Sequence, residues 1–234
     1  MHFKKLLLES PKLKSKEIFK AIEIAIPSTA IEAAILKTKV KEKRHRGLPS
    51  QLVVCLIIAM SLWSKDSVDG LKNLIDDLNE VGLKTGKYWK VPCKAAITQA
   101  RQRLGAGVMT QLFHQLVKPM ATVETVGAFL NGLRIIAIDG TCLDIPDSDE
   151  NARVFGRAGS RPGTRAAFPK ARLVILVEAG THLIFDALIC PYKIGERVRA
   201  LRLLRSVTQE MLLMWDRGLH SYAMVEATVS KGCD

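Results

Sequence analysis

Two aspartates follow apolar runs that are typical of buried strands: Asp139 after residues 133–138, and Asp216 after residues 211–215. If the two strands are parallel neighbours in a sheet, their carboxyl ends meet at one crevice and the two carboxylates converge there. Two negative charges this close favour a cation between them, and Mg²⁺ accepts a carboxylate pair together with water and phosphate oxygens. The pair therefore predicts metal-dependent displacement at a phosphodiester.

Each aspartate, taken alone, also fits a turn or cap role at a strand end, so the sequence leaves both interpretations open. Arg217 either meets a phosphate or neutralises Asp216. His220 either contacts DNA or water near a metal ion, or is an ordinary surface or core histidine. Cys142 has no histidine placed to activate it, which favours a buried strand cysteine over a nucleophile.

The elements that would position the aspartates lie in residues 131–234, which we expect to form one domain. A long polar loop is expected at residues 147–169, and an antiparallel meander followed by a helical crossover accounts for the order of the rest. The expected strands are 133–140, 171–178, 182–190 and 211–216, and the expected helices are 194–208 and 222–230.

Residues 1–130 are predicted to form a separate, helical and basic domain. Apolar positions recur at helical spacing, and Pro27 and Gly105 mark helix ends. The expected helices are 15–26, 28 to about 37, 50–63, 67–78 and 95–105. The predicted fold class is therefore a helical N-terminal domain followed by an α/β domain with a mixed sheet.

The net charge of +12 favours nucleic acid or an anionic membrane surface as a partner. The longest apolar stretch, residues 52–63, is shorter than the roughly 20 residues that span a bilayer, so no membrane partner is expected. The start of the chain lacks the apolar region of an export signal. The five cysteines show no zinc-binding or disulfide spacing and are expected to be reduced thiols of a cytoplasmic protein.

Two basic segments are candidates for contact with DNA. The connector at residues 39–47 carries Lys43, Arg44 and Arg46, and it fits either a solvated linker or an arm that contacts phosphates. The helix at 95–105 presents polar and basic side chains at helical spacing. Among them, Gln99, Arg101 and Arg103 could reach phosphates or base edges, although an amphipathic helix facing water has the same pattern.

Several short motifs resemble those of bacterial DDE transposases of the insertion-element-four type. In the N-terminal part they are Arg46-Gly47-Leu48-Pro49 and Ala100-Arg101-Gln102-Arg103-Leu104-Gly105. In the C-terminal part they are Asp139-Gly140-Thr141, Pro146 to Asn151 with Phe155-Gly156, Phe168-Pro169, Glu178-Ala179-Gly180-Thr181-His182 and Asp216-Arg217-Gly218. Each motif is weak alone, and the resemblance rests on their combination from about residue 15 to the end.

This resemblance implies an RNase H-like catalytic core in which Asp139 and Asp216 are the first two acids of the DDE triad and bind Mg²⁺ or Mn²⁺. It also implies cleavage at element ends and strand transfer into target DNA. The expected partners are element terminal repeats, target DNA and further copies of the chain in an active complex. The expected location is the cytoplasm, at the nucleoid.

The third acid of that family lies downstream in a Tyr-x-x-Arg-x-x-x-Glu-x-x-x-x-x-x-Lys signature, which these 234 residues lack. Glu226, on the helix after Asp216, has no matching Tyr, Arg or Lys spacing and is no substitute. We therefore expect a truncated core that is inactive alone. The alternatives are a non-catalytic DNA-binding or inhibitory fragment, and a degenerate relic.

Overall fold

The computed structural model describes residues 22–44, 46–62, 92–159 and 166–233 of the chain. The chain divides into two compact units, Met1–Leu116 and Val117–Asp234. Residues 117–130, which were expected with the helical part, belong to the second unit. The helix expected at 67–78 and most of the one expected at 15–26 fall outside the described residues.

The first unit is built from helices around its own apolar core. Its helices are α3 (Ser28–Lys37), α4 (Ser50–Leu62), α6 (Lys94–Leu104) and α7 (Ala106–Leu116). Helix α6 buries Ile97, Ala100 and Leu104, which recur at helical spacing on one face, so its polar residues point outward. It ends at Gly105, whose φ of 70° is the left-handed conformation that glycine adopts readily.

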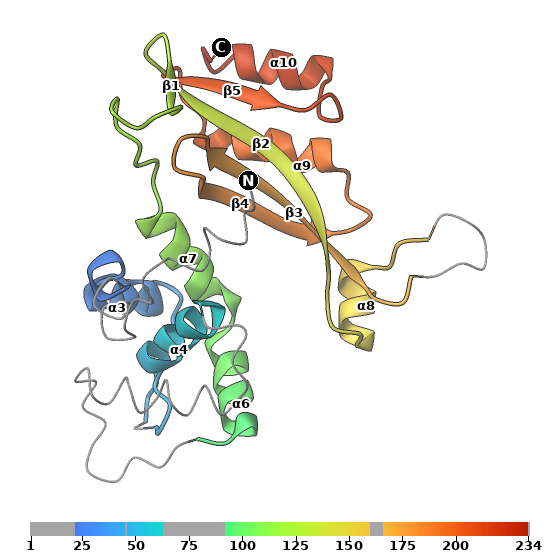
Figure 1. The fold of residues 1–234 in the computed structure, drawn as a ribbon. Helices are drawn as coiled ribbons and strands as arrows, with labels where there is room; N and C mark the ends of the chain where they lie inside the picture. Colours follow the sequence, from blue (N-terminus) through green and yellow to red (C-terminus); the bar gives the residue numbers. More distant parts are fainter. Residues whose placement is uncertain (1–21, 45, 63–91, 160–165, 234) are drawn as a thin grey trace, which may run out of the picture. The chain divides into compact units, whose positions relative to one another are not determined.

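The second unit contains a mixed sheet with the strand order β1-β2-β3-β4, and β5 pairs with β2. Its strands are β1 (Phe129–Leu130), β2 (Leu133–Asp144), β3 (Lys170–Glu178), β4 (Leu183–Pro191) and β5 (Met211–Trp215). Figure 1 shows β2 between β3 and β5. The antiparallel meander β2–β3–β4 and the crossover to β5 confirm the order expected from the sequence.

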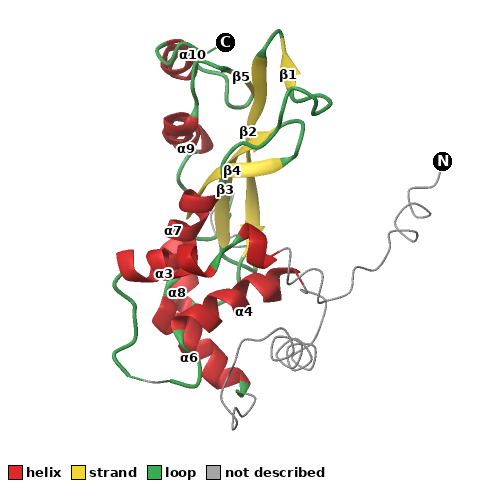
Figure 2. Cartoon of the chain, turned by 90° about the vertical axis from the view of Figure 1, so that its left-hand side faces the viewer, coloured by secondary structure: helices red, strands yellow, loops and turns green. Residues whose placement is uncertain are grey.

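Helix α9 (Glu196–Leu203) and helix α10 (Tyr222–Val229) lie on the same side of the sheet (Figure 2). Strands β2 and β3 bury alternate residues, and Ile136, Ile138 and Leu176 pack with Leu203 and Met224 of these helices. Because side chains alternate across a strand, Asp139 lies on the opposite face of the sheet from Ile138.

Two expectations are corrected by the structure. The segment 147–169 is not wholly loop, because helix α8 (Asp149–Phe155) begins after Ser148, whose hydroxyl accepts the Asn151 amide. Asp139 does not end its strand either, because β2 continues to Asp144 in register with β3. The parallel pairing of β2 with β5 does end before Asp139, and its last pair is Ile138 and Trp215.

Candidate active site

Asp139 and Asp216 each follow one partner of the last parallel pair, Ile138 and Trp215. Paired residues of neighbouring strands point to the same face, and neighbouring strands lie about 4.8 Å apart. Asp139 continues β2 and lies on the face of the sheet opposite Ile138, whereas Asp216 follows the last residue of β5 and begins a turn. Both residues are exposed. Each of the two predicted acids thus directly follows a residue of the last parallel pair of β2 and β5.

Gly140 shapes the strand around Asp139. Its amide donates to Asp139 Oδ1 at 2.7 Å, which holds one carboxylate oxygen close to the strand. On the other face, a Cβ at position 140 would lie 2.9 Å from Glu196 Cγ, closer than real Cβ contacts come. Glycine therefore allows the first residue of α9 to lie against β2 directly beside the candidate site.

A tight turn holds the second aspartate. The Leu219 amide donates to Asp216 Oδ1 at 3.0 Å, so the carboxylate accepts a hydrogen bond from the turn that it begins. A Cβ at Gly218 would lie 3.2 Å from both carboxylate oxygens, so a larger residue would crowd this side chain. Arg197 of α9 reaches the same turn, because its Nε donates to the Gly218 carbonyl at 2.7 Å.

The donor set fits a divalent cation. Asp139 and Asp216 are exposed and offer hard oxygen ligands, and no described cation forms an ion pair with either. Within the described ranges, no group of three or more His, Cys, Asp or Glu residues is placed to hold a metal ion. The described structure thus offers two exposed carboxylates as candidate ligands.

Three further residues were singled out in the sequence near the two aspartates: Arg217, His220 and Cys142. Arg217 is exposed and forms no ion pair with Asp216 in the described part of the chain, so neutralisation of Asp216 by Arg217 is not seen. His220 is exposed. Cys142 is half-buried on β2 and has a free thiol.

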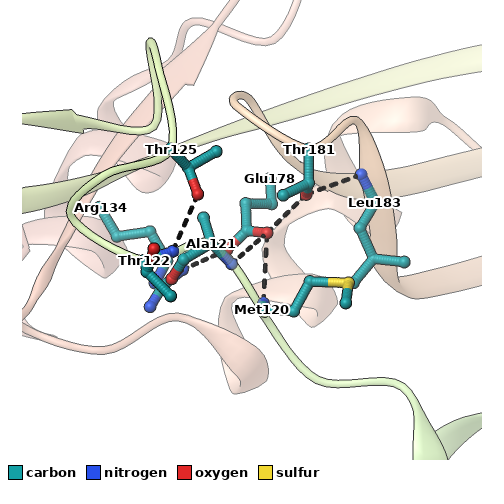
Figure 3. A network of polar contacts seen from close by, with 8 residues as sticks. All are labelled: Met120, Ala121, Thr122, Thr125, Arg134, Glu178, Thr181 and Leu183. Carbon is teal, nitrogen blue, oxygen red and sulfur yellow. Dashed lines mark hydrogen bonds and ion pairs between the residues drawn. The ribbon is translucent and has the colours of Figure 1, made fainter.

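Glu178 is a fully buried carboxylate whose role the sequence did not indicate. It accepts hydrogen bonds from the Ala121 amide at 3.0 Å, from the Met120 amide at 3.2 Å and from the Thr181 hydroxyl at 2.5 Å (Figure 3). Arg134 forms an ion pair with its other oxygen. Burial raises the pKa of Glu178, but these hydrogen bonds outweigh it and hold the pKa below the usual range.

The Glu178-Ala179-Gly180-Thr181-His182 motif is thereby explained as a structural connection. It ties the end of β3 to residues 120–121 at the start of the second unit. A Cβ at Gly180 would lie 2.8 Å from the Ala128 backbone, so the turn needs glycine for close approach. The feature of the sequence that could have indicated this structural role is a glutamate, Glu178, at the end of an otherwise largely apolar strand.

Asp186 forms the second buried anionic centre, on β4. Arg205 Nε and Nη2 donate to its two carboxylate oxygens at 2.9 and 2.8 Å, and the Ser206 hydroxyl donates at 2.5 Å. Burial raises the pKa of Asp186, but these donors outweigh it and lower the pKa. The network fixes the 3₁₀ turn Leu204–Ser206, which follows α9, against the sheet.

The candidate DNA-binding residues of the first unit differ in their surroundings. Lys43, Arg44 and Arg46 of the connector are exposed, as are Gln99 and Arg101 of α6. Arg103 instead donates to the Leu48 carbonyl at 2.8 Å and lies 4.0 Å from Glu42. The two N-terminal motifs, one around Leu48 and the other on α6, are therefore joined to each other by Arg103.

Comparisons with known proteins agree with the motifs. Residues 17–114 match the family described as "Insertion element 4 transposase N-terminal". The chain is 28% identical over 209 residues to "Putative transposase InsZ" of Escherichia coli strain K12, covering 89% of this chain and 67% of that protein. It is also 28% identical over 184 residues to "Transposase InsG for insertion sequence element IS4" of the same organism.

These matches relate the chain to the transposases. Within that class they confirm the resemblance to the insertion-element-four type. The InsG alignment covers 79% of this chain but 40% of InsG. No solved structure matches the chain. Among the described helices, none is long and apolar enough to cross a membrane.

Proposed function

We propose that this chain contributes to DNA transposition, with Asp139 and Asp216 as two of the carboxylates that bind the divalent metal for strand cleavage and strand transfer. The observation that supports the proposal is the parallel register of β2 and β5, because its last pair, Ile138 and Trp215, directly precedes the two aspartates. The similarity to transposases supports DNA as the substrate, which we propose takes the form of element ends and target DNA.

The order of the elements supports an RNase H-like core as part of this proposal. Three antiparallel strands are followed by a crossover helix and a strand parallel to the first. In such a sheet the crevice at the ends of the parallel strands is the natural ligand site. The third acid of the family's triad is not among these 234 residues, so a further segment would have to supply it.

The residues of the chain have separate tasks in this scheme. Bound Mg²⁺ or Mn²⁺ would stabilise charge on the attacking and leaving oxygens of the phosphodiester. Asp139 and Asp216 would supply ligand oxygens, each already oriented by one backbone amide, from Gly140 and from Leu219. Arg217, exposed beside Asp216, would meet a phosphate of the bound strand.

Iron-directed cleavage of the polypeptide tests the metal site without requiring transposition. Fe²⁺ in place of Mg²⁺, with ascorbate and peroxide, should cut the chain near residues 139 and 216. Asp139→Asn and Asp216→Asn should each abolish both cuts, whereas Asp149→Asn, exposed on α8, should leave them unchanged. Unaltered cutting in both site variants would overturn the proposed metal site.

The first unit is proposed to bind DNA through the connector and α6. Element-end duplexes should bind more tightly than random duplexes, and binding should weaken with salt because phosphate contacts release counterions. Arg44→Ala and Arg101→Ala should each reduce the slope of log K against log salt by about 1. Lys231→Ala, an exposed residue of the second unit, should not change it. Equal slopes for all three variants would contradict this interface.

A second candidate function is a DNA-binding product that occupies element ends without cutting them or pairs with other subunits. It is favoured by the first unit's own core, in which Val54, Leu56 and Val108 are buried. Salt-sensitive binding to element ends together with no iron-directed cleavage would select this function over the catalytic one. Sedimentation of the chain with and without element-end DNA would test self-association.

A further inference from the structure

We propose that Arg197 is a positioning residue for the Asp216 carboxylate, acting through the turn at residues 216–219. The inference rests on the proposed metal site and adds a residue to it. Arg197 lies on α9, the crossover helix, and touches neither aspartate in the contacts described. Its effect on the site would be exerted entirely through Gly218.

The path from Arg197 to the carboxylate has two short steps. Arg197 Nε donates to the Gly218 carbonyl oxygen at 2.7 Å. The ideal Cβ position of Gly218 is 3.2 Å from both Asp216 carboxylate oxygens, so a shift of this residue alters the space available to them. The next amide, that of Leu219, donates to Asp216 Oδ1 at 3.0 Å. Holding Gly218 therefore holds the orientation of the carboxylate.

The turn needs such support because Asp216 is exposed and lies beyond the last residue paired with β2. A side chain in that setting keeps its rotamer freedom unless a contact removes it. Helix α9 is a firm anchor, since Ala200 and Leu203 are fully buried against the sheet. Arg197 thus connects a buried helix to an exposed turn.

A positioning role and a simple charge effect predict opposite results for metal binding. A guanidinium near the site disfavours a cation by repulsion, so its removal would tighten metal binding if charge alone mattered. If Arg197 orients Asp216, its removal would loosen the ligand and weaken metal binding. Residues that orient metal ligands typically change the affinity by about 10-fold or more when they are replaced.

The matched control is Arg202, on the same helix. It is exposed, and its side chain forms no hydrogen bond or ion pair within the described residues. Arg197→Ala and Arg202→Ala remove the same charge from the same helix, and alanine favours helix in both places. Arg197→Lys keeps the charge and a donor, and it should recover part of the wild-type behaviour.

The first measurement is amide hydrogen exchange by NMR on the whole chain without metal. Arg197→Ala should raise the exchange rate of the Leu219 amide at least several-fold, whereas Arg202→Ala should not. Amides of the β2–β3 ladder should exchange at the wild-type rate in both variants, which excludes general unfolding. An unchanged Leu219 rate in Arg197→Ala would overturn the proposal, whatever the metal does.

The second measurement is Mn²⁺ binding to the same proteins, followed by electron paramagnetic resonance. Arg197→Ala should raise the Kd roughly tenfold, with Arg197→Lys intermediate and Arg202→Ala unchanged. An equal or tighter Kd in Arg197→Ala would overturn the positioning role. If Asp139→Asn and Asp216→Asn leave Mn²⁺ binding unchanged, the metal site itself fails, and the positioning of a metal ligand fails with it.

Discussion

Four acidic residues of the second unit form two pairs with opposite surroundings. Asp139 and Asp216 are exposed, and within the described residues their carboxylates accept hydrogen bonds from backbone amides. Glu178 and Asp186 are 0% and 1% exposed, and cationic and neutral donors surround them. The exposed pair retains free oxygens for a ligand, whereas the buried pair uses its oxygens to hold the fold.

Glu178→Gln should lower the free energy of unfolding of the second unit by roughly 2–4 kcal/mol, because it leaves Arg134 without its anionic partner and turns an amide toward backbone donors. Urea unfolding followed by circular dichroism measures the change. Glu226→Gln, an exposed residue of α10, is the matched control and should stay within about 0.5 kcal/mol of wild type. A similar small effect for Glu178→Gln would show that the buried network contributes little.

The lowered pKa values of Glu178 and Asp186 predict loss of stability in acid. A carboxyl group with a lower pKa in the folded state stabilises the fold fully above its unfolded pKa of about 4. That contribution disappears as the pH falls through the folded pKa. The urea concentration at the midpoint of unfolding, measured between pH 6 and pH 3, should therefore decrease once the pH is below about 4. The decrease should be smaller in Asp186→Asn. A profile that Asp186→Asn leaves unaltered would contradict the assignment.

At the scale of elements, the contact of α9 with the sheet depends on a glycine of β2, Gly140. Glu196, at the start of α9, lies against Gly140 of β2 and pairs with Arg172 of β3 at 3.0 Å. Near its other end, Arg205 secures the following turn to β4. The helix and the turn that follows it are thus attached to three strands.

Gly180→Ala should be more destabilising than Gly140→Ala. The added Cβ at position 180 would meet the Ala128 backbone, with Cα at 2.8 Å, whereas at position 140 it would meet the flexible Glu196 side chain. We expect Gly180→Ala to cost about 1–3 kcal/mol, and Gly140→Ala to cost less. Gly107→Ala should be tolerated, because its nearest neighbour is Thr38 Cγ2 at 3.8 Å. Thermal unfolding gives the ranking, and equal costs at 140 and 180 would refute the argument.

The strands and longer helices could be predicted because their residues repeat at the strand or helix period. The pattern on α6, with Ile97, Ala100 and Leu104 buried, is of this kind. Helix α8 was missed because it is short and lies in a segment rich in polar and turn-forming residues. The extension of β2 to Asp144 was missed because its end is polar and exposed, and only the pairing with β3 specifies it.

The contacts around the candidate site could not be predicted from the sequence. Asp139 and Asp216 could be singled out because each follows an apolar run, and each directly follows a residue of the last parallel pair of β2 and β5. The contact of Arg197 with Gly218 and that of Arg103 with Leu48 join residues far apart in sequence, and no periodicity reports such contacts. Arg103 is an example: it was predicted to contact DNA, but its side chain donates a hydrogen bond to a backbone carbonyl of the protein itself.

At the scale of the molecule, each unit has its own apolar core. Leu56 is 1% exposed in the first unit, and Leu203 is 0% exposed in the second. Apart from Arg217, the residues proposed to bind DNA lie in the first unit, whereas those proposed to bind metal lie in the second. Stability and function should therefore be separable along the chain.

Leu56→Ala and Leu203→Ala should each cost about 2–5 kcal/mol in the unit that contains the residue. Leu56→Ala should weaken DNA binding and leave Mn²⁺ binding unchanged, and Leu203→Ala should do the reverse. Fluorescence anisotropy with element-end DNA and Mn²⁺ titration, applied to both variants, check the separation. Loss of both activities in both variants would show that the two units depend on each other.

The parallel pairing of β2 with β5 also constrains the order of folding. Strands β3 and β4 pair across a short turn and β2 pairs with β3 across residues 145–169, whereas the pairing of β5 with β2 encloses both of these strands and the crossover. Closing such a long loop is slow, because its entropy is lost before the contact is gained. The strand ends that precede Asp139 and Asp216 should therefore come together in one of the last steps of folding, so that a partly folded chain would lack the proposed metal site.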